Sequence, residues 1–174
     1  MPEKANSLDD KVSRLQRALY QAAKRSPNRR FHALYDKIYR EDVLWSAWSE
    51  VRANRGSGGV DGQSIEGIEK GEGVFPFLEQ VRKELKEGSY RPQAVRRVEI
   101  PKPDGSKRPL GIPTVKDRVV EAACRKVVEP IFEADFQDCS YGFRRKRGAR
   151  QVHQGIREDV FRGYNWVVDG DIRK

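Results

Sequence analysis

The sequence has few of the residues that build metal centres or disulfide frameworks. Its 174 residues include 2 cysteines and 2 histidines. Cys124 and Cys139 have no CxxC partner, and His32 and His153 lie far apart in the chain, which argues against a zinc site. Two thiols in so polar a chain fit a reducing compartment better than a disulfide framework.

Long apolar runs are missing as well. No stretch approaches the roughly 18 apolar residues of a membrane span, and the N-terminus MPEKANSLDD lacks the apolar segment of a secretory signal. We therefore expect a cytoplasmic protein that does not enter a membrane. The length suffices for one domain with a sizeable core, or for a small domain with a helical extension.

Positive charge, by contrast, is abundant and concentrated. Lys and Arg number 35 against 26 Asp and Glu, for a net charge of +9. Residues 91–118 hold eight basic and three acidic side chains, and residues 144–150 hold five basic and none acidic. These segments together carry +10, so the rest of the chain carries about −1. A local excess of this kind is typical of proteins that bind nucleic-acid phosphates, and a solvated basic surface is the alternative.

The first third of the chain has the apolar spacing of helices. Ser7 and Asp10 resemble a capping box, and the apolar residues that follow predict an amphipathic helix that ends before Ser26. A second apolar series, over residues 31–51, predicts one long helix or two abutting helices through about Ala53.

Residues 54–62, NRGSGGVDG, predict a loop because they contain four glycines and only one aliphatic side chain. Such a loop has backbone N–H groups that could approach a phosphate, with Arg55 beside it. A flexible connection is the alternative. The loop is not a P-loop, since no Gly-Lys-Ser/Thr follows.

The middle of the chain changes from helical to strand periodicity. A helix near Pro76 is expected to stop at Gly88. Residues 94–112 then predict a β-hairpin, because β-branched segments flank the turn sequence PDGS. The hairpin brings three cations close to its tip, which suggests an anionic ligand; they are Lys102, Lys107 and Arg108.

The last third combines helices with a basic, aromatic loop. Thr114 and Asp117 form a capping-box pattern before a helix that we expect to end before Pro130. Residues 140–148, SYGFRRKRG, read as a loop whose cations and rings suit single-stranded nucleic acid, with a solvated basic loop as the alternative. A helix over about 149–161 and a strand toward the C-terminus follow. The order of elements argues for an α/β or α+β fold with an all-helical N-terminal extension.

The segment NWVVDGDIRK, residues 165–174, places two carboxylates, Asp169 and Asp171, after an apolar run of strand character. Carboxylates at a strand end are a common way to hold a divalent cation over phosphate chemistry.

These motifs together resemble a known family. The passages RPQAVRRVEIPKPDGSKRPLGIPTVKDRVVEAA, SYGFRRKRGARQVHQ and WVVDGDIRK look like the fingers and first palm strand of a group II intron reverse transcriptase, or intron-encoded maturase. The loop NRGSGGVDG resembles the segment that precedes the fingers. The resemblance covers roughly residues 40–174 in the family's order. It implies a right-hand polymerase with a helical extension and loop (1–62), a fingers subdomain (63–163) and a truncated first palm strand (164–174).

The resemblance also implies roles for individual residues. Asp171 matches the first palm aspartate, which binds the catalytic Mg²⁺ ions with the backbone carbonyl of Ile172, and Asp169 is the less favoured carboxylate. Lys102 and Arg108 match the residues that contact the triphosphate of the incoming nucleotide. The loop 54–62 corresponds to one that covers the template strand. The cations implied on the template and intron-RNA side are Arg96, Arg97, Arg144, Arg145, Lys146 and Arg147, and we add Arg55 beside the loop.

Two functional hypotheses follow from this resemblance. The first is the N-terminal part of an RNA-directed DNA polymerase that binds the RNA template and the nucleotide, with a DNA primer, dNTP and Mg²⁺ in the complete enzyme. The family's Asp-Asp palm motif and thumb do not occur in the 174 residues. We therefore expect this chain to bind RNA without polymerising, and a separate chain could supply the rest of the palm and the thumb. The alternative is a stand-alone intron-RNA-binding module; a weaker third hypothesis is a related bacterial lineage, CRISPR-associated or diversity-generating.

Overall fold

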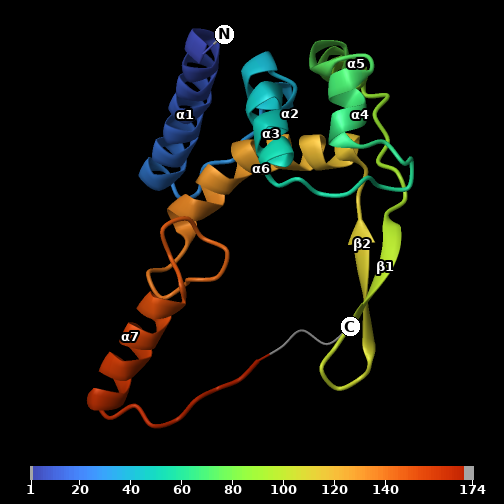
Figure 1. Cartoon of the computed structure of the whole chain (residues 1–174). Helices are drawn as coiled ribbons and strands as arrows, with labels where there is room; N and C mark the ends of the chain where they lie inside the picture. The colour runs from blue at the N-terminus through green and yellow to red at the C-terminus, as the bar shows by residue number, and fades with distance from the viewer. Residues whose placement is uncertain (1, 171–174) are drawn as a thin grey trace. The chain divides into compact units, whose positions relative to one another are not determined.

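The computed structural model describes the backbone of residues 2–170 and the side chains of residues 8–170. The chain divides into two compact units, Met1–Ala134 and Asp135–Lys174. Helices joined to a two-stranded antiparallel sheet make this an α+β fold, in agreement with the predicted class (Figure 1). The elements are α1 (Pro2–Arg25), α2 (Tyr35–Ile38), α3 (Glu41–Ala53), α4 (Ile65–Lys70), α5 (Val74–Glu87), β1 (Arg96–Pro101), β2 (Lys107–Ile112), α6 (Val115–Asp135) and α7 (Ala149–Phe161).

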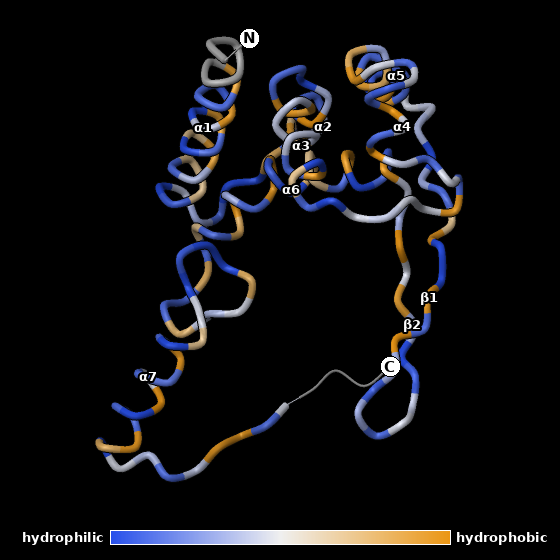
Figure 2. Tube along the Cα trace, in the orientation of Figure 1, coloured by the Kyte–Doolittle hydropathy of each residue, from blue (hydrophilic) through white to orange (hydrophobic). Residues whose placement is uncertain are grey.

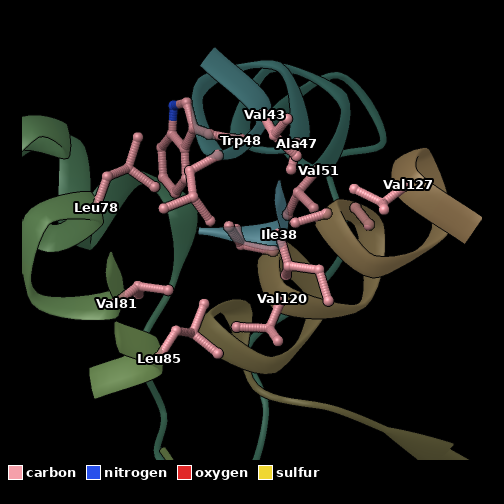
Figure 3. Packing of buried hydrophobic residues seen from close by; sticks show 14 of the residues in the cluster. Ile38, Val43, Ala47, Trp48, Val51, Leu78, Val81, Leu85, Val120 and Val127 are labelled. Carbon is pink, nitrogen blue, oxygen red and sulfur yellow. The ribbon is translucent and has the colours of Figure 1, made fainter. Parts of the chain in front are cut away.

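The helices of the first unit share one hydrophobic core. Helix α3 buries Val43, Ala47 and Val51, which are four residues apart and therefore lie on one face. Helix α5 contributes Val81 and Leu85 to the same core, beside residues of α2 and α6 (Figure 3). Residues on both sides of residue 62 therefore bury their apolar surface together in this unit, and the division at residue 62 that the family resemblance implies stays a prediction.

The predicted limits of the N-terminal helices agree with the structure, except for the start of the first helix. Helix α1 ends at Arg25, and the second apolar series forms two abutting helices, α2 and α3, of which the latter ends at Ala53. Helix α1 begins at Pro2, so Ser7 lies within the helix and the predicted cap there is wrong. Helix α4 was not predicted, since it has only six residues; the Ser64 hydroxyl caps it by accepting a hydrogen bond from the Gly67 amide at 2.9 Å.

Helix α6 runs through Pro130 to Asp135, so the prediction that it ends before the proline is wrong. A proline inside a helix leaves the carbonyl four residues earlier without its amide donor. Here that carbonyl belongs to Lys126, and Nε2 of Gln16 on α1 donates to it at 3.0 Å. A neighbouring helix thus supplies the hydrogen bond that Pro130 removes. Lys24 of α1 binds the carbonyl of Ala134 near the end of α6 in the same way, at 3.1 Å.

The hairpin and the C-terminal residues differ in how well they form their predicted strands. Strands β1 and β2 project from the helices, and Figure 2 shows their connecting loop as hydrophilic. Residues 164–170, by contrast, form no strand, and Trp166 and Val168 are each 96% exposed. A strand requires a partner for its backbone hydrogen bonds, and the sheet in the described part of the chain contains only β1 and β2.

In residues 2–170 no helix is long and apolar enough to cross a membrane.

Candidate nucleic-acid interface

The β-hairpin separates its cations onto two faces. Cross-strand partners share a face of the sheet, and in this register Ile100 pairs with Arg108 while Pro101 pairs with Lys107. Arg108 therefore lies on the same face as Val98 and Ile100, and Lys107 lies on the opposite face. Lys102 follows β1 and continues the alternation of Ile100, so it shares the face of Arg108. The alternation thus assigns both residues predicted to hold a triphosphate to one face of the hairpin.

A fixed turn holds Lys102 in place. Its amide donates to the Ser106 carbonyl at 2.8 Å, and the Gly105 amide donates to the Lys102 carbonyl at 3.0 Å. Gly105 has φ of 82°, a conformation that favours glycine. Asp104 accepts hydrogen bonds from the side chain and amide of Ser106, and these bonds lower the pKa of its carboxyl group. The turn therefore presents Lys102 from a defined backbone.

The other face of the hairpin has its charge partly neutralised. Glu99 lies 3.5 Å from Nζ of Lys107 and 3.9 Å from a guanidinium nitrogen of Arg97. Within the described part of the chain, neither Lys102 nor Arg108 has a carboxylate within ion-pair distance. The face with Lys102 and Arg108 is consequently the one that can attract an external anion.

The glycine-rich loop is packed rather than free. Gly59 is buried, and a Cβ atom there would lie 2.6 Å from Cα of Thr114. Arg96 and Arg118 both donate hydrogen bonds to this loop. Arg55 has an exposed side chain and a positive φ of 47°, and it lines a polar cleft of about 840 Å³ between the ends of α3 and α4. The loop is therefore held by contacts within the first unit, unlike the flexible connection that was the alternative for this segment.

A buried carboxylate anchors the segment that leads into the hairpin. Half of the predicted capping box forms, since the Thr114 hydroxyl accepts a hydrogen bond from the Asp117 amide at 3.1 Å. The same hydroxyl donates to the Asp117 carboxylate at 2.7 Å, in place of the bond from the Thr114 amide that a full capping box contains. The hydroxyl of Tyr90 donates to Asp117 at 2.5 Å, and the amide of Gln93 does so at 3.2 Å. Burial of the Tyr90 hydroxyl raises its pKa, and the hydrogen bond to Asp117 raises it further. Sequence analysis missed Tyr90 and Gln93, because no local pattern pairs them with a residue so far along the chain.

In the second unit, Arg144 and Arg147 of the basic loop contact other residues of the same loop. Arg144 is 9% exposed and donates to the carbonyls of Gln137 and Ser140, each at 2.7 Å. Arg147 pairs with Asp138 and stacks on Tyr141, with 5.5 Å between the guanidinium carbon and the ring centre.

The same loop exposes the residues that lie between and beside those two arginines. Arg145 and Lys146 have exposed side chains, and the ring of Phe143 lies fully in solvent. Cations and a ring, the combination that suits single-stranded nucleic acid, are therefore exposed together on this loop, and the RNA-binding role of Arg144, Arg145, Lys146 and Arg147 stays a prediction.

The predicted metal ligands lie at the limit of the described chain. Asp171 and Ile172 fall outside it, and Asp169 lies in the exposed stretch 164–170. In residues 2–170 no three or more His, Cys, Asp or Glu side chains are grouped so as to hold a metal ion. The Mg²⁺ site thus stays a prediction.

No protein-family model matches the chain, but individual proteins do. It is 34% identical over 146 residues to the group II intron-encoded protein LtrA of Lactococcus lactis, a match that covers 82% of this chain and 23% of that protein. It is 37% identical over 171 residues to the protein YkfC of Escherichia coli, covering 92% and 43%. The nuclear intron maturase 1 of Arabidopsis thaliana, a mitochondrial protein, is 42% identical over 60 residues, covering 34% and 8%. The chain spans less than half the length of each of these relatives.

Proposed function

Because the chain belongs to the family of group II intron reverse transcriptases and intron maturases, we propose that it forms the part of such an enzyme that binds the RNA template and the incoming nucleotide. In this proposal residues 63–163 act as the fingers of a right-hand polymerase and the stretch 164–174 leads into its palm. Polymerase activity would also require the remaining palm carboxylates of the family.

The observation that carries the proposal is the placement of Lys102 and Arg108 on one exposed face of the hairpin. Two fixed cations there can neutralise the charge that accumulates as pyrophosphate leaves the nucleotide. Asp171 and the carbonyl of Ile172 would hold Mg²⁺, which stabilises developing charge on phosphate oxygens. The DNA primer would supply the attacking 3′-hydroxyl.

The RNA partner is proposed from the exposed cations and the family. Arg145, Lys146 and the ring of Phe143 supply contacts for phosphates and a base on one short loop. In the first unit, Arg55 and Arg97 have exposed side chains that could also contact phosphates. The ligand is an intron RNA or an RNA template.

Nucleotide binding is tested by equilibrium dialysis of the chain against a radiolabelled dNTP with Mg²⁺. Lys102→Ala and Arg108→Ala should each weaken binding about tenfold, since a hydrogen bond to a charged group contributes roughly 1.5–3 kcal/mol. Lys107→Ala is the matched control, because it removes the same charge from the opposite face, where Glu99 neutralises it. Equal losses in all three variants would show a general charge effect and refute a specific site.

RNA binding is tested by anisotropy of a labelled single-stranded RNA over a series of salt concentrations. Substituting Arg145 and Lys146 by Ala should flatten the salt dependence by about 0.7 per lost phosphate contact. An unchanged slope would mean that the loop is merely solvated. RNA binding without any dNTP binding would favour the second candidate, an intron-RNA-binding module, which the exposed basic and aromatic loop also supports.

A further inference from the structure

Two arginines from different elements converge on the glycine-rich loop. Arg96, on β1, donates from Nε to the carbonyl of Gly58 at 3.1 Å and from Nη2 to the hydroxyl of Ser57 at 3.0 Å. Arg118, on α6, donates from Nη2 to the carbonyl of Ser57 at 2.7 Å and from Nε to the carbonyl of Thr114 at 3.5 Å. The loop is thus tied to both the hairpin and the helix that follows it.

The glycines of the loop allow this close approach. A Cβ atom on Gly56 would overlap the guanidinium group of Arg118, and one on Gly58 would lie 2.8 Å from the carbonyl oxygen of Gln63. Real Cβ atoms essentially never come so close to other atoms. Glycine is needed at position 58 because a Cβ atom there would meet the backbone, whereas a Cβ atom at position 56 would displace the flexible end of the Arg118 side chain from the loop.

We propose that Arg96 and Arg118 form a clamp, and that Arg96 is a positioning residue for the loop 54–62 rather than a ligand of RNA. Its guanidinium already donates to two oxygens of the loop, so it would have to give up these bonds to bind a phosphate. Arg96 also lies on the hairpin face that carries Arg108, so the clamp fixes the proposed template loop to the proposed nucleotide-binding hairpin. The effect of this clamp on RNA binding rests on the proposed function, whereas its effect on the loop of the free chain does not.

The clamp is tested without any ligand by hydrogen–deuterium exchange of two amides of the loop, that of buried Gly59 and that of Gly62, which donates to the Gly59 carbonyl at 3.4 Å. Arg96→Lys keeps the charge but loses the planar fork that reaches both Ser57 and Gly58. It should raise exchange in the loop about tenfold, as should Arg96→Ala, since each loses two hydrogen bonds. Arg97→Ala is the matched control, because Arg97 lies on the opposite face of the hairpin and should leave the loop unchanged. Exchange at the wild-type rate in Arg96→Lys would overturn the proposal.

The second arm measures binding of single-stranded RNA as a function of salt. If Arg96 contacts a phosphate, Arg96→Lys keeps the affinity and Arg96→Ala flattens the salt slope by about 0.7. The clamp predicts instead that Lys and Ala weaken binding to the same extent, several-fold, with an unchanged slope. Rescue by Lys, or full affinity in both variants, would overturn the positioning role.

A third comparison makes the result specific to the clamp. In a Ser57→Ala background one of the two bonds from Arg96 has already been lost, so Arg96→Lys should raise loop exchange less than it does in the wild type. Effects that add in full would refute the direct contact. If the wild-type chain binds no RNA, the proposed function fails, while the exchange measurements still decide whether the clamp exists.

Discussion

The hydrogen bond between Gln16 and the carbonyl of Lys126 can be isolated by a double-mutant cycle. Its length is 3.0 Å, and it replaces the backbone bond that Pro130 cannot make. Gln16→Ala leaves the carbonyl without this donor. Because the site is only partly buried, water can replace part of the bond, and we expect a loss of about 1 kcal/mol rather than the roughly 3 kcal/mol of a fully buried orphan.

The assay is equilibrium unfolding in urea, with the free energy of unfolding taken from the midpoint and the slope. In a Pro130→Ala background the new backbone amide can donate to Lys126, so Gln16→Ala should cost little, which gives a coupling energy of about 1 kcal/mol. Pro130→Ala alone should stabilise the chain, because proline is unfavourable by about 3 kcal/mol within a helix.

Gln21→Ala serves as the control, since Gln21 lies exposed on the same helix and its replacement should stay within about 0.5 kcal/mol. An equal cost of Gln16→Ala in both backgrounds would refute the reasoning. It would mean that Gln16 acts through some contact other than the carbonyl that Pro130 leaves without a donor.

Two further predictions concern the buried carboxylate before the hairpin. Asp117→Asn should lower the free energy of unfolding by about 3 kcal/mol, because an amide nitrogen would face the groups that donate to Asp117. Urea unfolding checks this, with Asp9→Asn, at an exposed position of α1, as the control. The pKa of Tyr90 is raised in the folded chain. Above about pH 10 the phenol of Tyr90 therefore ionises in the unfolded chain but keeps its proton in the folded chain, so the free energy of unfolding falls as the pH rises past that value. Tyr90→Phe should remove this part of the alkaline loss while Tyr164→Phe retains it, and identical pH profiles for both variants would contradict the assignment.

Local signals in the sequence were sufficient for much of the fold. The turn sequence PDGS between β-branched segments predicted the hairpin, whose strands are Arg96–Pro101 and Lys107–Ile112. The limits of α7, Ala149–Phe161, also match the prediction. Gly88 ends α5 in the left-handed conformation that glycine favours at a helix end. Each of these features depends on residues within a few positions of one another.

The roles of the cations needed the tertiary structure. A run such as RRKR shows no difference between its members, yet Arg144 and Arg147 hold the loop while Arg145 and Lys146 have exposed side chains. Arg96 and Arg97 are neighbours in sequence but lie on opposite faces of the hairpin, and only Arg96 reaches the glycine-rich loop. The partners of Arg96 and Arg144 are backbone carbonyls and a hydroxyl, which leave no pattern in composition or spacing.

The sequence by itself determined the local elements, the basic character and the family, because these depend on short-range geometry, on charge and on motifs in a fixed order. The tertiary structure decided where α6 ends, since Gln16 supplies the donor that Pro130 lacks. It also decided that the glycine-rich loop is packed and which arginines hold it. Each of these outcomes depends on hydrogen bonds between residues far apart in the chain, which form only after the helices have packed.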